Sequence, residues 1–163
     1  GRKRNICAGG VQFMLNGMEF ISRNYEDTFN FAKEFAKKLK KGDVITLDGD
    51  LGAGKTAFVS GLAKGLDISE IVQSPTFTIV NEYKSGKIPL YHFDVYRIMS
   101  VDEMYDIGFD EYLFGGGICA VEWADNIREM FDMPHIEIKI LKDLSLSSDY
   151  RKIVVTPKNG KVF

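Results

Sequence analysis

Apolar residues recur along the chain with two different periods, which predict helices and strands in turn. Phe31, Phe35 and Leu39 recur every four residues, and this spacing predicts an amphipathic helix that Asn24 caps. A compact run of β-branched and apolar residues at 44–47 predicts a buried strand. Further strands are expected at 19–22, 76–80, 89–96, 118–121, 136–140 and 153–155, and short helices after residue 56 and at 101–107, 109–114 and 126–131.

The strand at 44–47 leads directly into a glycine-rich segment, Gly49-Asp50-Leu51-Gly52-Ala53-Gly54-Lys55-Thr56. This segment matches the P-loop pattern GxxxxGK[ST], and the residues that follow it favour a helix. Glycines let the backbone curl so that consecutive N–H groups point at phosphate oxygens, and the helix dipole adds positive potential. Lys55 is then expected at the β- and γ-phosphates and the Thr56 hydroxyl at Mg²⁺. The predicted nucleotide-binding residues are Asp50, Leu51, Gly52, Ala53, Gly54, Lys55, Thr56 and Ala57.

Strands interleaved with helices predict an α/β sheet covered on both faces. Residues 84–87 read as a hairpin turn between two strands, so the sheet is expected to be mixed, with parallel strands mainly at its centre. The fold class is therefore a three-layer P-loop NTPase domain. Since the chain has no repeat, low-complexity tract or linker, residues 18–163 are expected to form one domain.

The first 17 residues show no usable periodicity. Gly1-Arg2-Lys3-Arg4 resembles the charged start of a signal peptide, but the apolar stretch after it is too broken by glycine and asparagine to serve as one. We expect residues 1–17 to be a leader, either foreign to the native chain or disordered, with Met18 as the native start.

Composition narrows the function classes. The chain has 163 residues, 45% hydrophobic and 27% charged, with a formal net charge of −2, which is typical of a globular protein. No basic field covers the molecule, so sequence-independent binding of nucleic acid is not expected. The two cysteines, Cys7 and Cys119, form neither a disulfide framework nor a zinc pattern, and Cys119 reads as a small buried hydrophobe. No apolar stretch reaches the length of a membrane span, so we expect a cytoplasmic protein with no membrane partner.

A P-loop needs an acidic side chain opposite it to hold or orient the metal ion. Glu122 follows a predicted buried strand and should emerge at its carboxyl end, where ligands bind in open α/β sheets. Asp94 shares one face of its predicted strand with His92 and Tyr96. From the pattern alone, that polar face fits an acidic residue of the site and a solvent-facing edge strand about equally.

Three further features have two readings each. Thr76, in the hydroxyl-rich segment 74–78, is either a switch that senses the γ-phosphate or part of an ordinary loop. Trp123, the only tryptophan, either stacks on the base or anchors a partner, or else lies in the core. Glycines 115–117 precede a strand rather than a helix, so we interpret them as a connection and not as a second phosphate loop.

Four segments in this order resemble the TsaE family, the small bacterial ATPases of tRNA threonylcarbamoyladenosine biosynthesis: residues 49–56, 74–78, 92–97 (His-Phe-Asp-Val-Tyr-Arg) and 121–123 (Val-Glu-Trp). The resemblance covers roughly residues 18–156. Ala124 stands where the family often has proline, which puts only the shape of that loop in doubt.

The resemblance implies an ATPase, weak alone, that supports placement of a threonylcarbamoyl group on the adenosine beside the tRNA anticodon. The transfer itself would belong to a partner transferase subunit paired with its non-catalytic paralogue, so that tRNA is contacted only indirectly. By position, Lys55, Thr76, Asp94 and Glu122 are implied as catalytic residues, and Thr56, Asp94 and Glu122 as Mg²⁺ residues, with ATP/ADP and Mg²⁺ as cofactors. Which acid contacts the metal stays open. Arg97 is a candidate for the arginine that stabilises phosphoryl transfer.

Three rivals share the P-loop. A small-molecule or nucleoside kinase usually carries arginines in a lid, whereas the C-terminal third of this chain has only Arg128 and Arg151. A GTPase is disfavoured because neither an NKxD nor a DxxG signature is present. A non-catalytic, nucleotide-gated assembly module would bind partners in an ATP-dependent manner that survives loss of hydrolysis.

Overall fold

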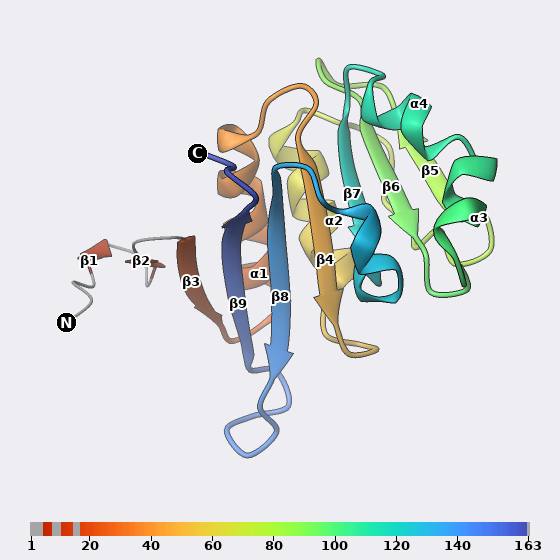
Figure 1. Cartoon of the computed structure of the whole chain (residues 1–163). Coiled ribbons are helices and arrows are strands. Elements are labelled where there is room, and N and C mark those ends of the chain that lie inside the picture. The colour runs from red at the N-terminus through yellow and green to blue at the C-terminus, as the bar shows by residue number, and fades with distance from the viewer. Residues whose placement is uncertain (1–4, 8–10, 15–16, 163) are drawn as a thin grey trace.

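The computed structural model describes residues 5–7, 11–14 and 17–162. Within these residues, a mixed sheet of nine strands runs in the order β1-β2-β3-β9-β8-β4-β7-β6-β5 (Figure 1). The strands are β1 (Asn5–Cys7), β2 (Val11–Met14), β3 (Gly17–Ser22), β4 (Val44–Gly49), β5 (Val80–Tyr83), β6 (Leu90–Asp94), β7 (Ile118–Glu122), β8 (His135–Lys142) and β9 (Arg151–Lys158).

The four central strands, β8, β4, β7 and β6, are parallel, and antiparallel strands extend the sheet on both sides. This arrangement confirms the predicted mixed α/β sheet with a parallel centre. Because the central strands point the same way, their carboxyl ends meet at one edge, the lower edge in Figure 1. The loop between β8 and β9 projects from the same edge.

Helices cover both faces of the sheet. On one face lie α1 (Tyr25–Phe35), continued by the 3₁₀ turn η1 (Ala36–Lys38), and α2 (Lys55–Gly65). On the other lie α3 (Val101–Asp106), α4 (Phe109–Leu113) and the 3₁₀ segment η2 (Ala124–Met130). The Asn24 side chain caps α1 by accepting a hydrogen bond from the Asp27 N–H at 2.8 Å, as predicted. No helix among the described residues has the length and hydrophobicity needed to cross a membrane.

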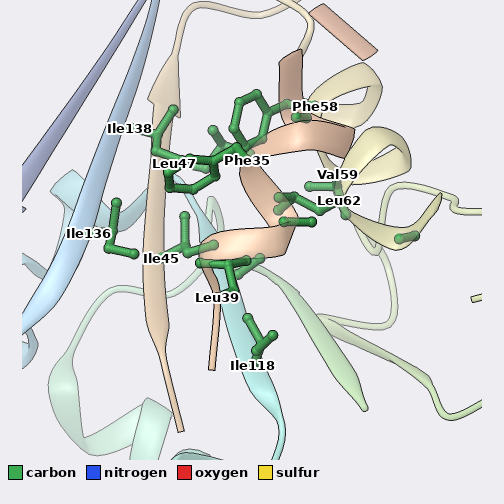
Figure 2. Packing of buried hydrophobic residues seen from close by; sticks show 14 of the residues in the cluster. Phe35, Leu39, Ile45, Leu47, Phe58, Val59, Leu62, Ile118, Ile136 and Ile138 are labelled. Atoms are coloured by element: carbon green, nitrogen blue, oxygen red, sulfur yellow. The ribbon is translucent and has the colours of Figure 1, made fainter. Parts of the chain in front are cut away.

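The larger core lies between the sheet and the pair α1–α2 (Figure 2). Phe35 and Leu39, from the predicted helical stripe, pack there with Phe58 and Leu62 of α2 against Ile45 of β4. Every one of these side chains is buried, and Phe31 and Phe35 lie on the core face of α1 as predicted. Leu39 is wrongly predicted as helical, since it follows η1 with an extended backbone (φ −82°, ψ 148°), although its side chain still reaches the core. This packing fixes the start of α2 relative to the end of β4, the two elements that flank the glycine-rich loop.

Two further sequence predictions differ from the structure. Residues 76–79, predicted as a strand, form a turn, which the Ile79 N–H closes by donating to the Pro75 carbonyl at 2.8 Å. Ile79 there has φ 68°, a conformation incompatible with a strand. The alternative of a solvent-facing edge strand at 89–96 is wrong, because β6 lies between β5 and β7 and buries His92 completely.

The segment predicted to be a leader contributes two short strands, β1 and β2, which pair in series with β3. Residues 1–4, 8–10 and 15–16 of this segment lie outside the described residues. Pairing of edge strands needs only backbone N–H and C=O groups, and side-chain periodicity does not report it. The origin of residues 1–17 is not decided by this pairing, and the leader stays a prediction.

Candidate active site

A cavity of about 530 Å³ opens at the carboxyl edge of the sheet, between the glycine-rich loop, the segment 74–76 and the ends of β6 and β7. Of the residues that the sequence singled out, it is lined by Leu51, Gly52, Ala53, Gly54, Lys55, Thr56, Ala57, Thr76, Asp94 and Glu122. Tyr25, Ser74, Tyr96, Arg97 and Trp123 complete the lining. Asp50 is the one predicted binding residue outside this lining, and it borders a neighbouring cavity instead.

The glycine-rich loop has the backbone shape that its sequence predicts. Gly52 and Gly54 have φ 75° and 102°, in the left-handed region where side chains are disfavoured. A Cβ atom on Gly49 would lie 2.7 Å from the Ile140 carbonyl oxygen, so β8 also requires a glycine there. Directly after Gly54, α2 begins at Lys55 and turns its amino terminus toward the cavity.

Lys55 is a buried cation that its own loop holds. Its Nζ atom donates hydrogen bonds to the carbonyl oxygens of Gly49 at 2.5 Å and Asp50 at 3.2 Å. The same atom lies 4.0 Å from the centroid of the Trp123 ring. Burial lowers the pKa of Lys55 below its ordinary value, and the nearby carboxylates Glu122 and Asp94 oppose that shift. The site therefore places a partly desolvated ammonium group where an anion can approach it.

The two acids predicted from the sequence come together because their strands are neighbours. Asp94 of β6 and Glu122 of β7 are register partners in a parallel pair, and both side chains are buried. They share the face of the sheet on which α2 packs, and this brings both near Lys55. The structure thus confirms the expected position of Glu122 at a strand's carboxyl end and places Asp94 beside it.

Each acid has a hydrogen-bonding partner that fixes it. The Oε2 atom of Glu122 lies 2.7 Å from the Nε2 atom of His92, a residue the sequence marked only as part of a polar strand face. The Oδ1 atom of Asp94 accepts a hydrogen bond from the Tyr96 N–H at 3.0 Å. The Thr76 hydroxyl lies 3.5 Å from Asp94 Oδ2, so the segment 74–76 closes over this acid.

Trp123 forms one wall of the cavity and is only partly buried, packed against the edge of the second core. It adopts φ 63°, a left-handed conformation that costs a bulky residue about 1–3 kcal/mol. Its backbone N–H donates a hydrogen bond to the Leu47 carbonyl at 3.2 Å, and the centroid of its ring lies 4.9 Å from that of Tyr96. These contacts hold the indole ring over Lys55.

Behind Trp123 lies an ionic network that the sequence did not suggest. The buried Asp48, the last residue but one of β4, accepts hydrogen bonds from Arg128 Nη2 at 2.7 Å and the Asp125 N–H at 3.2 Å. Burial raises the pKa of the Asp48 carboxyl, and the hydrogen bond from Arg128 opposes this. The network ties η2 to the end of β4 and so supports the turn that carries Trp123. Its members are far apart in sequence, so no local pattern reveals them.

The remaining predicted features lie away from the cavity or at its rim. Glycines 115–117 connect α4 to the amino end of β7, at the opposite edge of the sheet, as the interpretation as a connection requires. Cys119 is 1% exposed, and burial raises the pKa of its thiol to about 12, in agreement with a small buried hydrophobe. Arg97 lies at the exposed rim, with its guanidinium 5.0 Å from the Phe77 ring.

Comparison with known proteins finds one family. The family model described as "Threonylcarbamoyl adenosine biosynthesis protein TsaE" matches residues 22–152. The tRNA threonylcarbamoyladenosine biosynthesis protein TsaE of Bacillus subtilis (strain 168) is 50% identical over 142 residues, which cover 87% of either chain. The protein of the same name from Treponema pallidum (strain Nichols) is 40% identical over 130 residues, covering 77% of this chain and 94% of the relative.

A solved structure has the same fold. The crystal structure of Bacillus subtilis YdiB superposes with a TM-score of 0.72 at 44% sequence identity, covering 85% of this chain and 84% of that one. The family model's range, residues 22–152, includes β4, β6, β7 and the loop after β4, so the elements that form the cavity lie inside the region that matches the family.

Proposed function

This chain belongs to the TsaE family of threonylcarbamoyl adenosine biosynthesis proteins, and from that premise we propose that it is a Mg²⁺-dependent ATPase of this pathway. The observation that carries the proposal is the convergence of Lys55, Asp94 and Glu122 on one cavity beside a glycine-rich loop. Asp94 and Glu122 come from the carboxyl ends of two neighbouring strands and Lys55 from the start of α2, which is how α/β proteins assemble nucleotide sites.

The residues present suit the triphosphate of ATP. The left-handed glycines Gly52 and Gly54 curl the loop around the amino terminus of α2, which favours anions. Lys55 is a cation whose charged form is disfavoured by burial, so a phosphate oxygen beside it would offset that cost. Adenine is the expected base, because the sequence lacks the guanine signature NKxD.

The donor set also suits Mg²⁺. The described residues contain no cluster of three or more His, Cys, Asp or Glu side chains able to hold a metal ion. Mg²⁺ bound with ATP does not need one, because it takes most of its oxygens from water and phosphate and one or two from protein. Thr56 and one of the two acids, Asp94 or Glu122, are the residues that would hold it. When bound, Mg²⁺ neutralises the charge that develops on the phosphates.

The protein groups then divide the work of hydrolysis. Lys55 binds and orients the phosphates. One of the two acids orients the attacking water, and the other would contact Mg²⁺. The hydrogen bond between His92 and Glu122 holds this acid in place. Thr76, which contacts Asp94, is the proposed switch that senses the γ-phosphate. Arg97 at the rim is available to stabilise the transferred phosphoryl group in cis.

Within the pathway, hydrolysis by this chain supports threonylcarbamoyl transfer to the adenosine next to the tRNA anticodon. The transferase subunit and its non-catalytic paralogue are the proposed partners, and tRNA is contacted only through them. A formal net charge of −2 supports indirect contact with tRNA. The protein is proposed to act in the cytoplasm, where tRNA is modified.

The decisive experiment measures Mg-ATP hydrolysis by the protein alone and with its cognate transferase pair, with the Lys55→Ala variant as control. Weak turnover that rises with the pair and is lost in the variant supports the proposal. A turnover that does not change when the transferase pair is added would show that the ATPase does not act in this pathway. Phosphate transfer to nucleosides or small acceptors would instead make the chain a kinase.

A further inference from the structure

Two cations outside the predicted motifs contact the glycine-rich loop from behind. Lys142 ends β8 and Arg151 begins β9, and their Cα atoms are register partners at the base of the β8–β9 hairpin. This hairpin projects from the edge of the sheet that carries the cavity (Figure 1). Neither residue lines the cavity, and Lys142 borders the neighbouring one beside Asp50.

Both side chains donate hydrogen bonds to carbonyl oxygens of the loop. Lys142 Nζ donates to Leu51 at 2.9 Å. Arg151 donates through Nε to Ala53 at 2.9 Å and through Nη2 to Gly52 at 3.2 Å. Three consecutive carbonyl groups of the loop are therefore bound by cations from one hairpin.

Arg151 also binds the hairpin itself. Its Nη1 atom donates to the carbonyl oxygens of Ser148 at 2.7 Å and Tyr150 at 2.8 Å. The guanidinium thus joins the hairpin loop to the glycine-rich loop. Within the described residues, neither Lys142 nor Arg151 forms an ion pair with a carboxylate. No carboxylate therefore neutralises the positive charge that these residues place beside the glycine-rich loop.

Hydrogen bonds that draw these carbonyl groups outward also orient the N–H groups of the loop. In a curled backbone, successive N–H groups face inward only if the carbonyl groups point elsewhere, and a buried or crowded carbonyl needs a donor to do so. Of the three residues whose carbonyl groups are bound, Ala53 is buried and Leu51 and Gly52 are exposed, so the Ala53 carbonyl depends most on its donor, Arg151. Charged donors make the stronger hydrogen bonds to such carbonyl groups.

We propose that Lys142 and Arg151 are positioning residues that hold the loop 49–54 in its phosphate-binding shape and place positive charge behind it. The inference rests on the proposed nucleotide binding and adds to it two residues from a different part of the chain. Through Arg151, the conformation of the hairpin loop 143–150 is coupled to nucleotide affinity.

The test measures the Kd of Mg-ADP by calorimetry for wild-type protein and for Arg151→Gln and Lys142→Gln. Lys152→Gln is the matched control, because Lys152 is the next residue on β9 and pairs with Glu19 instead of the loop. We expect Arg151→Gln to weaken binding about tenfold, the equivalent of one charged hydrogen bond, and Lys142→Gln to weaken it less. Lys152→Gln should bind like wild type.

Turnover separates positioning from general destabilisation. A loop that is less well shaped raises KM and leaves kcat nearly unchanged, whereas a partly unfolded variant loses kcat in proportion to its inactive fraction. Arg151→Lys should recover only part of the affinity, since one ammonium group does not reproduce the fork that spans Gly52 and Ala53. Thermal unfolding without nucleotide confirms that each variant is folded.

Arg151→Gln and Lys142→Gln variants that bind Mg-ADP like Lys152→Gln overturn the inference. Full recovery by Arg151→Lys would assign the effect of Arg151 to its charge and refute a separate role for the fork. Lys55→Ala distinguishes this failure from that of the proposed function. If Lys55→Ala loses binding and Arg151→Gln does not, only the positioning role is refuted. If Lys55→Ala still binds, the nucleotide site itself is refuted, and the positioning role with it.

Discussion

His92 and Glu122 form a buried pair on neighbouring parallel strands, with 2.7 Å between Nε2 and Oε2. Glu122 also lines the cavity, so the pair connects the interior of the sheet to the site. The Nδ1 atom of His92 is buried without a hydrogen-bond partner among the described residues, and Glu122 is therefore the ring's one polar contact there. The position of this acid depends on a residue outside the cavity.

Replacing His92 should cost stability. His92→Ala leaves a buried carboxylate without its partner, which lowers the free energy of unfolding by about 1–3 kcal/mol. Denaturation in urea measures this loss, and His92→Gln, which retains a hydrogen-bonding side chain, should lose less. An alanine variant as stable as wild type would show that Glu122 gains nothing from the pair.

Glu122→Gln should impair hydrolysis far more than binding. Removal of a group that orients water or acts on the metal lowers kcat by about 100-fold or more, while Lys55 and the loop still bind the phosphates. Asp94→Asn is the matched variant, since Asp94 is its register partner. The variant that needs more Mg²⁺ for half-maximal rate identifies the acid on the metal side. Wild-type turnover by Glu122→Gln would remove this residue from the site.

Lys55→Ala should weaken Mg-nucleotide binding by about 10- to 100-fold, the equivalent of one or two charged hydrogen bonds. Calorimetry measures the affinity. The melting temperature without nucleotide should change little, because the hydrogen bonds of Lys55 are to its own loop and its removal also removes the cost of burying its charge. Wild-type affinity in this variant would refute the P-loop assignment.

Trp123 should report on nucleotide binding. It is the only tryptophan of the chain, it lines the cavity, and the Lys55 ammonium lies 4.0 Å from its ring centroid. A phosphate that draws Lys55 away from the ring changes the polarity around the indole. Titration with Mg-ADP should therefore change the tryptophan fluorescence of the wild type and not that of Lys55→Ala. An unchanged signal under saturating ligand would place the phosphates away from Lys55.

The lowered pKa of Lys55 predicts opposite effects of alkaline pH on stability and affinity. Between the lowered folded pKa and the ordinary value of 10.5, the unfolded chain binds more protons at this site, so its contribution to stability rises with pH. Over the same window the folded protein loses the ammonium charge, and affinity for the phosphates falls. Paired titrations of affinity and unfolding check both signs, with Lys55→Ala lacking both trends.

The sequence alone determined the features that depend on local patterns. The spacing of Phe31 and Phe35 identified the buried face of α1, because neighbouring turns of a helix share a face, whereas Leu39 lies beyond the helix. The glycine pattern identified the loop between β4 and α2, because few residues tolerate left-handed backbone. Glu122 was placed at a strand end by the apolar run before it, and the mixed sheet followed from the order of the elements.

Only the tertiary structure decided which distant residues meet. Residues 76–79 form a turn instead of a strand, because the contacts of Thr76 with Asp94 and of Ile79 with Pro75 outweigh a local preference for strand. The pairing of His92 with Glu122 depends on the register of β6 and β7, and the hydrogen bonds of Arg151 to the loop span 98 and 99 residues. Such contacts arise from strand order and packing, which no local period of the sequence encodes.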